Sequence, residues 1–91
     1  MANISAVIRG WAYEINTGDV VEIHANVVLP FVPQIGAHLI PLPGDDYLQV
    51  TDVHINPHND PVVDIGTLFM TPLSDVGEML KRGWVRDETE N

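Results

Sequence analysis

The residues of this chain best suited to chemistry lie close together in the segment HINPHND, residues 54–60. The segment contains His54, His58 and Asp60, and imidazole and carboxylate groups are common zinc ligands. Two histidines four residues apart converge on a metal ion when they lie on one helix. Here an asparagine and a proline separate the histidines and a second proline follows, a composition typical of turns that excludes a helix. The segment is therefore predicted to be a turn, and we predict no metal site and no cofactor.

A second candidate for chemistry is a histidine facing an aspartate across a hairpin. If residues 57–61 form the loop, Ile55 pairs with Val63 and His54 pairs with Asp64, so apolar and polar residues each stay together. A carboxylate beside an imidazole orients the ring, as in many general bases. Opposite-charge pairs are also ordinary features of sheets. His54 and Asp64 are thus the catalytic candidates, in a chain that we expect to be non-enzymatic.

Aromatic and acidic residues suggest a third kind of site, a cleft that binds a cation. Aromatic faces attract cations, and an acidic rim would add to that attraction. The ligand-binding candidates for such a cleft are Trp11, Tyr13, Glu22, His24 and Asp52. The alternative is that the aromatic residues fill the core and that the histidine lies on a solvated strand face.

The charge distribution limits the partners that we expect. The formal net charge is −9, and Arg9 is the single basic residue among residues 1–80. Phosphate backbones and anionic membranes both require basic surface, so we expect neither nucleic acid nor a membrane as a partner. A basic protein or a cationic ligand would be attracted, and an acidic mimic of nucleic acid would also fit this charge.

Length and composition are typical of one small folded domain. The chain has 91 residues, of which 45% are hydrophobic, and no cysteine, so we expect one core and exclude disulfides. The first residues lack the basic and apolar segments of a secretory signal, and no apolar stretch is long enough to span a bilayer. We expect one domain over residues 1–86, a frayed acidic tail over residues 87–91 and a cytoplasmic location.

Short strands are the elements that must position these residues. Residues 20–31 alternate with period two, and their odd-numbered positions are apolar. A three-residue loop over residues 16–18, with Gly18 at positive φ, would pair this strand with the preceding one. In that register Trp11 and Tyr13 lie on the core face, opposite apolar residues of the second strand.

The next strands carry a bend and a change of phase. Two prolines in LPFVPQIG cannot donate to a central ladder, so the chain must bend there. In YLQVTDVHI the first apolar pair and the second lie in opposite phase. A bulge near Thr51 and Asp52 would bring both pairs to the core.

One helix is predicted near the C-terminus, over about residues 72–82. Thr71 would cap its start, and Gly83 would end it with Trp84 folded back onto Met79. Its buried stripe would consist of Leu73, Val76 and Leu80.

The order of these elements is similar to that of a known class of small barrels. A Pro-x-x-Gly bend, a strand, a GDDY turn, a bulged strand, a hairpin and a final strand follow one another. Over about residues 20–70 this succession resembles Src-homology-3-like barrels, and in size the chain resembles small barrel proteins of unknown function carried on bacterial mobile gene cassettes. The predicted fold is mainly β (α+β), with five antiparallel strands in a strongly bent sheet or small barrel and one C-terminal helix.

The apolar content favours association. The segment VLPFVPQIGAHLIPLP is rich in apolar residues, and an uncovered apolar patch or sheet edge invites a partner. We therefore expect a small acidic, non-enzymatic binding or assembly module that forms a homodimer. Two alternatives stay open: a binder of cationic small molecules or basic peptides in an acidic aromatic cleft, and a hydrolase or isomerase that uses His54 and Asp64.

Overall fold

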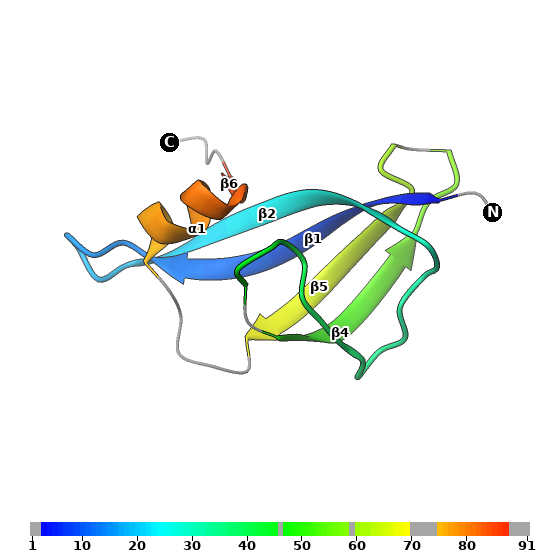
Figure 1. Ribbon diagram of the computed structural model, residues 1–91, viewed down its shortest axis with the longest axis horizontal. Coiled ribbons are helices and arrows are strands. Elements are labelled where there is room, and N and C mark those ends of the chain that lie inside the picture. Colours follow the sequence, from blue (N-terminus) through cyan, green and yellow to red (C-terminus); the bar gives the residue numbers. More distant parts are fainter. Residues whose placement is uncertain (1–2, 46, 59, 70–74, 88–91) are drawn as a thin grey trace.

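Strands dominate the fold, as the alternation predicts, and the computed structural model describes residues 3–45, 47–58, 60–69 and 75–87. The elements in chain order are β1 (Ile4–Tyr13), β2 (Val20–Leu29), β3 (His38–Leu39), β4 (Leu48–Ile55), β5 (Val63–Phe69), α1 (Val76–Arg82) and β6 (Val85–Arg86). The strands form one sheet in the order β3-β4-β5-β1-β2-β6, which curls into about half of a barrel (Figure 1). No helix in the described part of the chain has the length and apolar character needed to cross a membrane.

The mainly β class and the C-terminal helix are confirmed, whereas the prediction of five antiparallel strands is wrong in two respects. The two central strands, β1 and β5, run parallel to each other, so the sheet is mixed. A sixth strand, β6, adds to the free side of β2. No local turn pattern identifies a parallel pair in the sequence, because its two strands are joined by a long crossover connection and not by a hairpin.

The β1–β2 hairpin differs by one residue from its predicted register. Glu14 and Asp19 close a four-residue loop, in which Gly18 has a φ of +77° and donates its N–H to the Glu14 carbonyl. Tyr13 consequently pairs with Val20, and Trp11 pairs with Glu22. The predicted core position of Trp11 is therefore wrong, because the indole lies on the face away from the core and is 42% exposed.

The β4–β5 hairpin confirms its predicted register. His54 pairs with Asp64 and Ile55 pairs with Val63, with the loop between them as expected. The register shifts between Val50 and Asp52, so the predicted bulge is also present. The turn signals and the change of phase were sufficient for the register. The prediction that the bulge brings both apolar pairs to the core is wrong for Ile55, which is 60% exposed, whereas Leu48 and Val50 are buried.

The helix α1 is shorter than predicted in the described residues, and its buried face differs. Asp75 is its N-cap, with the carboxylate accepting from the Gly77 N–H, whereas the predicted cap Thr71 lies outside the described residues. Gly83 ends the helix in the left-handed region, and the Trp84 N–H donates to the Met79 carbonyl as expected. Leu80, predicted to be buried, is exposed. Val76, Met79 and Trp84 are the residues that pack into the core.

A buried carboxylate ties the helix end to the loop between β3 and β4. Asp45 accepts hydrogen bonds from the Trp84 indole N–H at 2.9 Å and from Arg82 Nη1 at 3.2 Å. The backbone N–H of Leu42 donates to the same carboxylate at 3.1 Å. Satisfying a buried acid with three donors makes this contact specific, because an unpaired carboxylate would be strongly destabilising there.

The core lies on the inner face of the curled sheet, beneath α1. It combines residues of β1, β2, β4, β5 and the C-terminal region: Ala6, Ile8, Ala12, Ile23, Ala25, Leu48, Val50, Val63, Ile65, Val76, Met79 and Trp84. The alternate residues of β1, β2, β4 and β5 point to the outer face, which is where the polar candidates lie.

Candidate functional site

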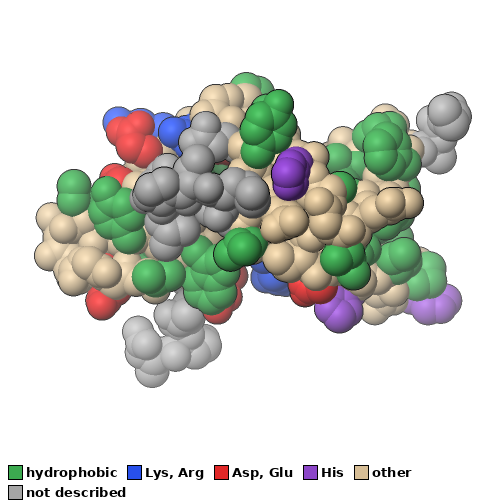
Figure 2. Space-filling model, turned by 90° about the horizontal axis from the view of Figure 1, so that it is seen from below, with side chains coloured by type: hydrophobic (Ala, Val, Ile, Leu, Met, Phe, Trp, Pro, Cys, Tyr) green, Lys and Arg blue, Asp and Glu red, His purple; other side chains and the backbone are tan. Residues whose placement is uncertain are grey.

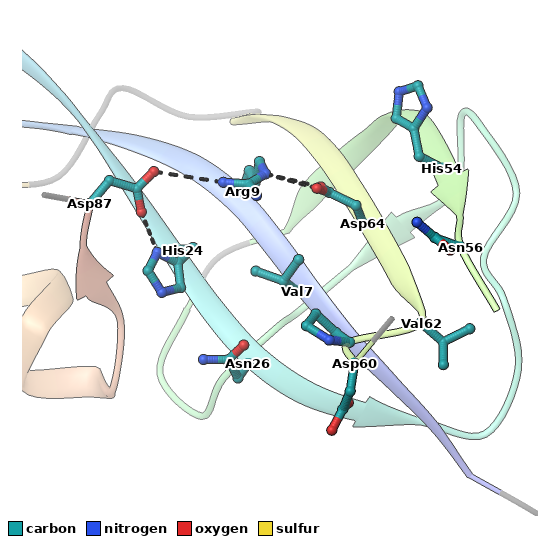
Figure 3. A pocket seen from close by; sticks show the side chains of 11 residues that line it. Val7, Arg9, His24, Asn26, His54, Asn56, Asp60, Val62, Asp64 and Asp87 are labelled. Carbon is teal, nitrogen blue, oxygen red and sulfur yellow. Dashed lines mark hydrogen bonds and ion pairs between the residues drawn. The ribbon is translucent and has the colours of Figure 1, made fainter. Parts of the chain in front are cut away.

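The outer face of the sheet carries a groove of about 700 Å³ (Figure 3). Its floor is formed by β1, β2 and β5, and its ends by the β4–β5 hairpin loop and by the first residue after β6. The lining residues are Val7, Arg9, His24, Asn26, His54, Asn56, Asp60, Pro61, Val62, Asp64 and Asp87. Most of the lining side chains are therefore polar, and the acidic ones outnumber the basic ones.

A chain of charged contacts crosses the groove from β5 to the end of β6. The Arg9 guanidinium donates from Nε to both oxygens of Asp64, at 3.0 and 3.1 Å. Its Nη1 lies 3.7 Å from Asp87, whose other carboxylate oxygen contacts Nδ1 of His24 (Figure 3). These positions follow from pairing, since Arg9 lies opposite His24 in the β1–β2 ladder. Each charge of the cluster is thereby partly compensated by a neighbour.

The predicted catalytic pair is brought together by the backbone and not by the side chains. His54 and Asp64 are partners in the β4–β5 ladder. Asp64 is engaged by Arg9, whereas the exposed His54 ring lies nearest to Asp52, with 3.9 Å between Nε2 and Oδ2. No hydrogen bond joins His54 to Asp64, both of which are described, and in Figure 3 the ring points away from the carboxylate.

An imidazole–carboxylate hydrogen bond instead joins His24 and Asp87. Asp87 belongs to the predicted tail, yet its backbone N–H donates to the Glu22 carbonyl at 3.0 Å and its side chain is mostly buried. A carboxylate on Nδ1 fixes the orientation of the ring. The sequence offers no local signal for this contact, because two strand residues after a helix are too short a pattern to recognise.

The five residues predicted to form a cation cleft are not gathered in the groove. All five are described, and His24 is the one among them that lines the groove. Trp11 and Glu22 lie opposite each other further along β1 and β2, and Tyr13 lies beyond them next to the hairpin loop. Asp52 extends over Gly66, where a built Cβ would lie 2.1 Å from its Oδ1. Trp11 and Glu22 are thus direct neighbours, whereas Asp52 lies on a different strand, β4.

The two histidines and the aspartate of HINPHND also lie in different elements and have different partners. His54 is on β4, His58 is in the loop with its N–H bonded to Asn56, and Asp60 accepts a hydrogen bond of 2.8 Å from the Ser5 hydroxyl. Across residues 3–45, 47–58, 60–69 and 75–87, no group of three His, Asp or Glu side chains is arranged to hold a metal ion. His54 and Ile55 thus end β4, and the described residues that follow belong to the predicted loop between β4 and β5.

A second candidate site is an uncharged surface formed by the exposed side chains of residues 28–40. Between Glu22 and Asp45 the sequence has no Asp, Glu, Lys or Arg, although the chain carries a net charge of −9. Phe31 and Ile35 are each 68% exposed, and a hollow of about 390 Å³ lies beside them, lined by residues 29–34 and 37–39. Figure 2 shows that exposed hydrophobic side chains recur over the face seen from below.

Comparisons with known proteins leave the site to be interpreted from its own geometry. No protein-family model matches the sequence, and neither a curated protein nor a solved structure is detectably similar to it. The resemblance to Src-homology-3-like barrels and to gene-cassette proteins therefore stays a prediction.

Proposed function

We propose that this protein is a non-enzymatic assembly module that forms a homodimer through the uncharged surface of residues 28–40. The observation that carries the proposal is the coincidence of exposure and neutrality in one segment. Large apolar side chains such as Phe31 and Ile35 are well exposed there, and no formal charge lies within the segment. Contiguous exposed apolar surface is typical of an interaction site.

The overall charge supports a second copy as the partner. Two molecules that each carry −9 repel one another wherever acidic surfaces meet. The uncharged surface is the region where two copies can approach without placing like charges in contact. A basic partner would instead gain most from the acidic parts of the molecule, so a surface without charge fits a second acidic copy best.

Light scattering after size exclusion, at rising protein concentration and at two salt concentrations, tests the proposal. The expected result is a dimer at high micromolar concentration, with tighter association at higher salt, because salt screens the repulsion between the copies and leaves apolar contacts intact. A monomer throughout this range would overturn the proposal.

A cation-binding role is a second candidate, which the groove supports. Three carboxylates, those of Asp60, Asp64 and Asp87, line it together with one guanidinium, that of Arg9. A thermal-shift screen with aliphatic diamines tests this role, since binding to the folded state raises the melting temperature. The shift should be smaller at high salt, opposite in direction to the salt effect on the dimer. No shift at millimolar diamine would remove this candidate.

The hydrolase or isomerase alternative receives less support. It requires His54 and Asp64 to act on one substrate, and Asp64 is already bound by Arg9 at 3.0 Å. An orienting carboxylate must contact the imidazole that it positions. We therefore place the non-enzymatic role first.

A further inference from the structure

The outer edge of β2 is covered over part of its length. On one side β2 pairs with β1 along all ten residues. On the other side β6 pairs with Ile23 and His24, and the following residue donates to the Glu22 carbonyl. Beyond these contacts the remainder of β2, Ala25–Leu29, has no neighbouring strand in the described part of the chain (Figure 1).

The backbone of this remainder has a defined direction. Because the Glu22 carbonyl accepts from the β6 side, the backbone groups of Glu22 point to the open edge. Backbone groups alternate in direction along an antiparallel strand, so those of His24, Asn26 and Val28 point the same way. Those of His24 lie beside β6, whereas those of Asn26 and Val28 face outward without a neighbouring strand among the described residues.

This part of the edge also lacks the usual protection against strand addition. Charged residues, a proline or a bulge commonly blunt an exposed edge. The sequence from Ala25 to Leu29 is Ala-Asn-Val-Val-Leu, which contains none of these, and Pro30 follows it. The uncharged surface begins directly beside this segment, since Val28 is 65% exposed and Phe31 is 68% exposed.

We propose that two copies pair through Ala25–Leu29 of β2, antiparallel and about a two-fold axis at Val27, which joins the two sheets into one. This inference rests on the proposed homodimer and specifies how it forms. In this arrangement Asn26 of each copy faces Val28 of the other, and the two residues exchange N–H···O=C bonds in both directions. The inner-face partners, Ala25 and Leu29, are both apolar.

Neighbouring registers are disfavoured by the backbone itself. An axis at Val28 would set Asn26 opposite Pro30, which has no N–H to donate. An axis at Asn26 would set Val28 opposite His24, whose edge is already occupied by β6. An axis between two residues would set an outward-pointing backbone opposite an inward-pointing one. The axis at Val27 is thus the one that lets Asn26 and Val28 each pair both the N–H and the C=O group.

Single-cysteine cross-linking tests this arrangement in the full chain, which contains no cysteine of its own. At the axis the two Val27 positions form a non-hydrogen-bonded pair, with Cα atoms about 4.5 Å apart, a separation that a disulfide can span. Mild oxidation of the Val27→Cys variant should give a covalent dimer. Val21→Cys is the matched control, because Val21 is a half-buried valine on the same face of β2, at the other end of the strand. It should stay uncross-linked.

Amide hydrogen exchange of the unmodified protein provides a second measurement that requires no substitution. The Asn26 and Val28 amides should exchange about tenfold more slowly when most of the protein is dimeric, because they become hydrogen bonded. If light scattering shows a dimer but neither the Val27→Cys cross-link nor this protection is observed, edge pairing is wrong and the homodimer stands. If the protein is monomeric, both proposals are wrong.

Discussion

The two halves of the outer edge of β2 differ in whether a neighbouring strand pairs with them in the described part of the chain. The first half, at Glu22–His24, is closed by β6 and fixed by polar contacts: Asp87 contacts His24, and Arg86 Nη1 lies 2.7 Å from Glu14. The second half, Ala25–Leu29, has no charge of its own, and no strand among the described residues covers it. An edge that pairs with a strand of the same chain stabilises the monomer. An unpaired, uncharged edge is available to a strand of a partner.

The largest expected effect concerns the residue that anchors the closed half. Trp84 is 2% exposed and precedes β6, and its indole donates to the buried Asp45. Trp84→Ala removes both the packing and a donor, so we expect it to lower the free energy of unfolding by about 3–5 kcal/mol. Urea unfolding monitored by circular dichroism measures this. Phe31→Ala, beside the open half, should change it by less than about 0.5 kcal/mol. Similar losses in the two variants would contradict the distinction between the halves.

A charge placed beside the open half should act on association and not on folding. Phe31→Glu puts an acidic group on the uncharged surface, and it should weaken dimerisation at least tenfold, equivalent to about 1.4 kcal/mol. Sedimentation equilibrium gives the dissociation constant. Ile15→Glu is the control, because Ile15 is 67% exposed, close to the 68% of Phe31, but lies in the β1–β2 loop. Equal weakening by both substitutions would indicate a general effect of added charge.

A smaller effect is expected from the carboxylate that fixes β6 to the groove. Asp87→Asn keeps the shape of the side chain and removes its charge, which weakens the contacts with Arg9 and His24. Arg9 is half exposed, so solvent screens the interaction and we expect a loss of about 1 kcal/mol. Urea unfolding at low and high salt measures it, and the loss should shrink at high salt. An unchanged stability at low salt would mean that β6 is held without this cluster.

The smallest effect on stability is expected from Gly66→Ala. Gly66 lies in a row of cross-strand neighbours that runs over the outer face to His24, in the closed half of the β2 edge. Asp52 pairs with Gly66, Gly66 with Arg9, and Arg9 with His24 across the sheet. Gly66→Ala would place a Cβ 2.1 Å from the Asp52 carboxylate, which is half exposed and free to turn toward solvent. We expect a loss of about 0.5 kcal/mol that changes to a gain when Asp52→Ala is also present, since alanine restricts the unfolded chain more than glycine. Thermal unfolding of the two single variants and the double variant gives the coupling. Additive effects would show that the Asp52 side chain does not lie over Gly66 in solution.

The β1–β2 register shows where sequence patterns were insufficient. Apolar character alone favours Trp11 and Tyr13 on the core face, yet the inner face of β1 carries the small residues Ala6 and Ala12 around Ile8. These small side chains belong to the same core cluster as Val76 and Met79 of α1 and Trp84. A pattern within β1 cannot indicate that a residue some seventy positions later occupies its core.

The two candidate sites also differ in how far the sequence predicts them. The apolar and uncharged character of residues 28–40 was recognisable from sequence. The exposure of Phe31 was not, because the alternation over residues 20–31 groups it with the core-facing positions, whereas β2 ends at Leu29. The groove was not recognisable either, since its polar cluster combines Arg9 of β1 and Asp64 of β5 with His24 and Asp87, which are 63 residues apart. The predicted backbone pairing of His54 with Asp64 is confirmed. The Asp64 side chain, however, accepts from Arg9 and not from His54.

The sequence by itself determined the strand-rich class, the β4–β5 register with its bulge, and the glycine that ends the helix. Each of these depends on turn chemistry, alternation or backbone conformation within about ten residues, and such preferences act wherever the segment lies. Only the tertiary structure decided the parallel β1–β5 pair, the position of Trp11, the strand β6 and the contact of Asp87 with His24. These features depend on which distant segments fill the same space, and that is a property of the packed chain as a whole.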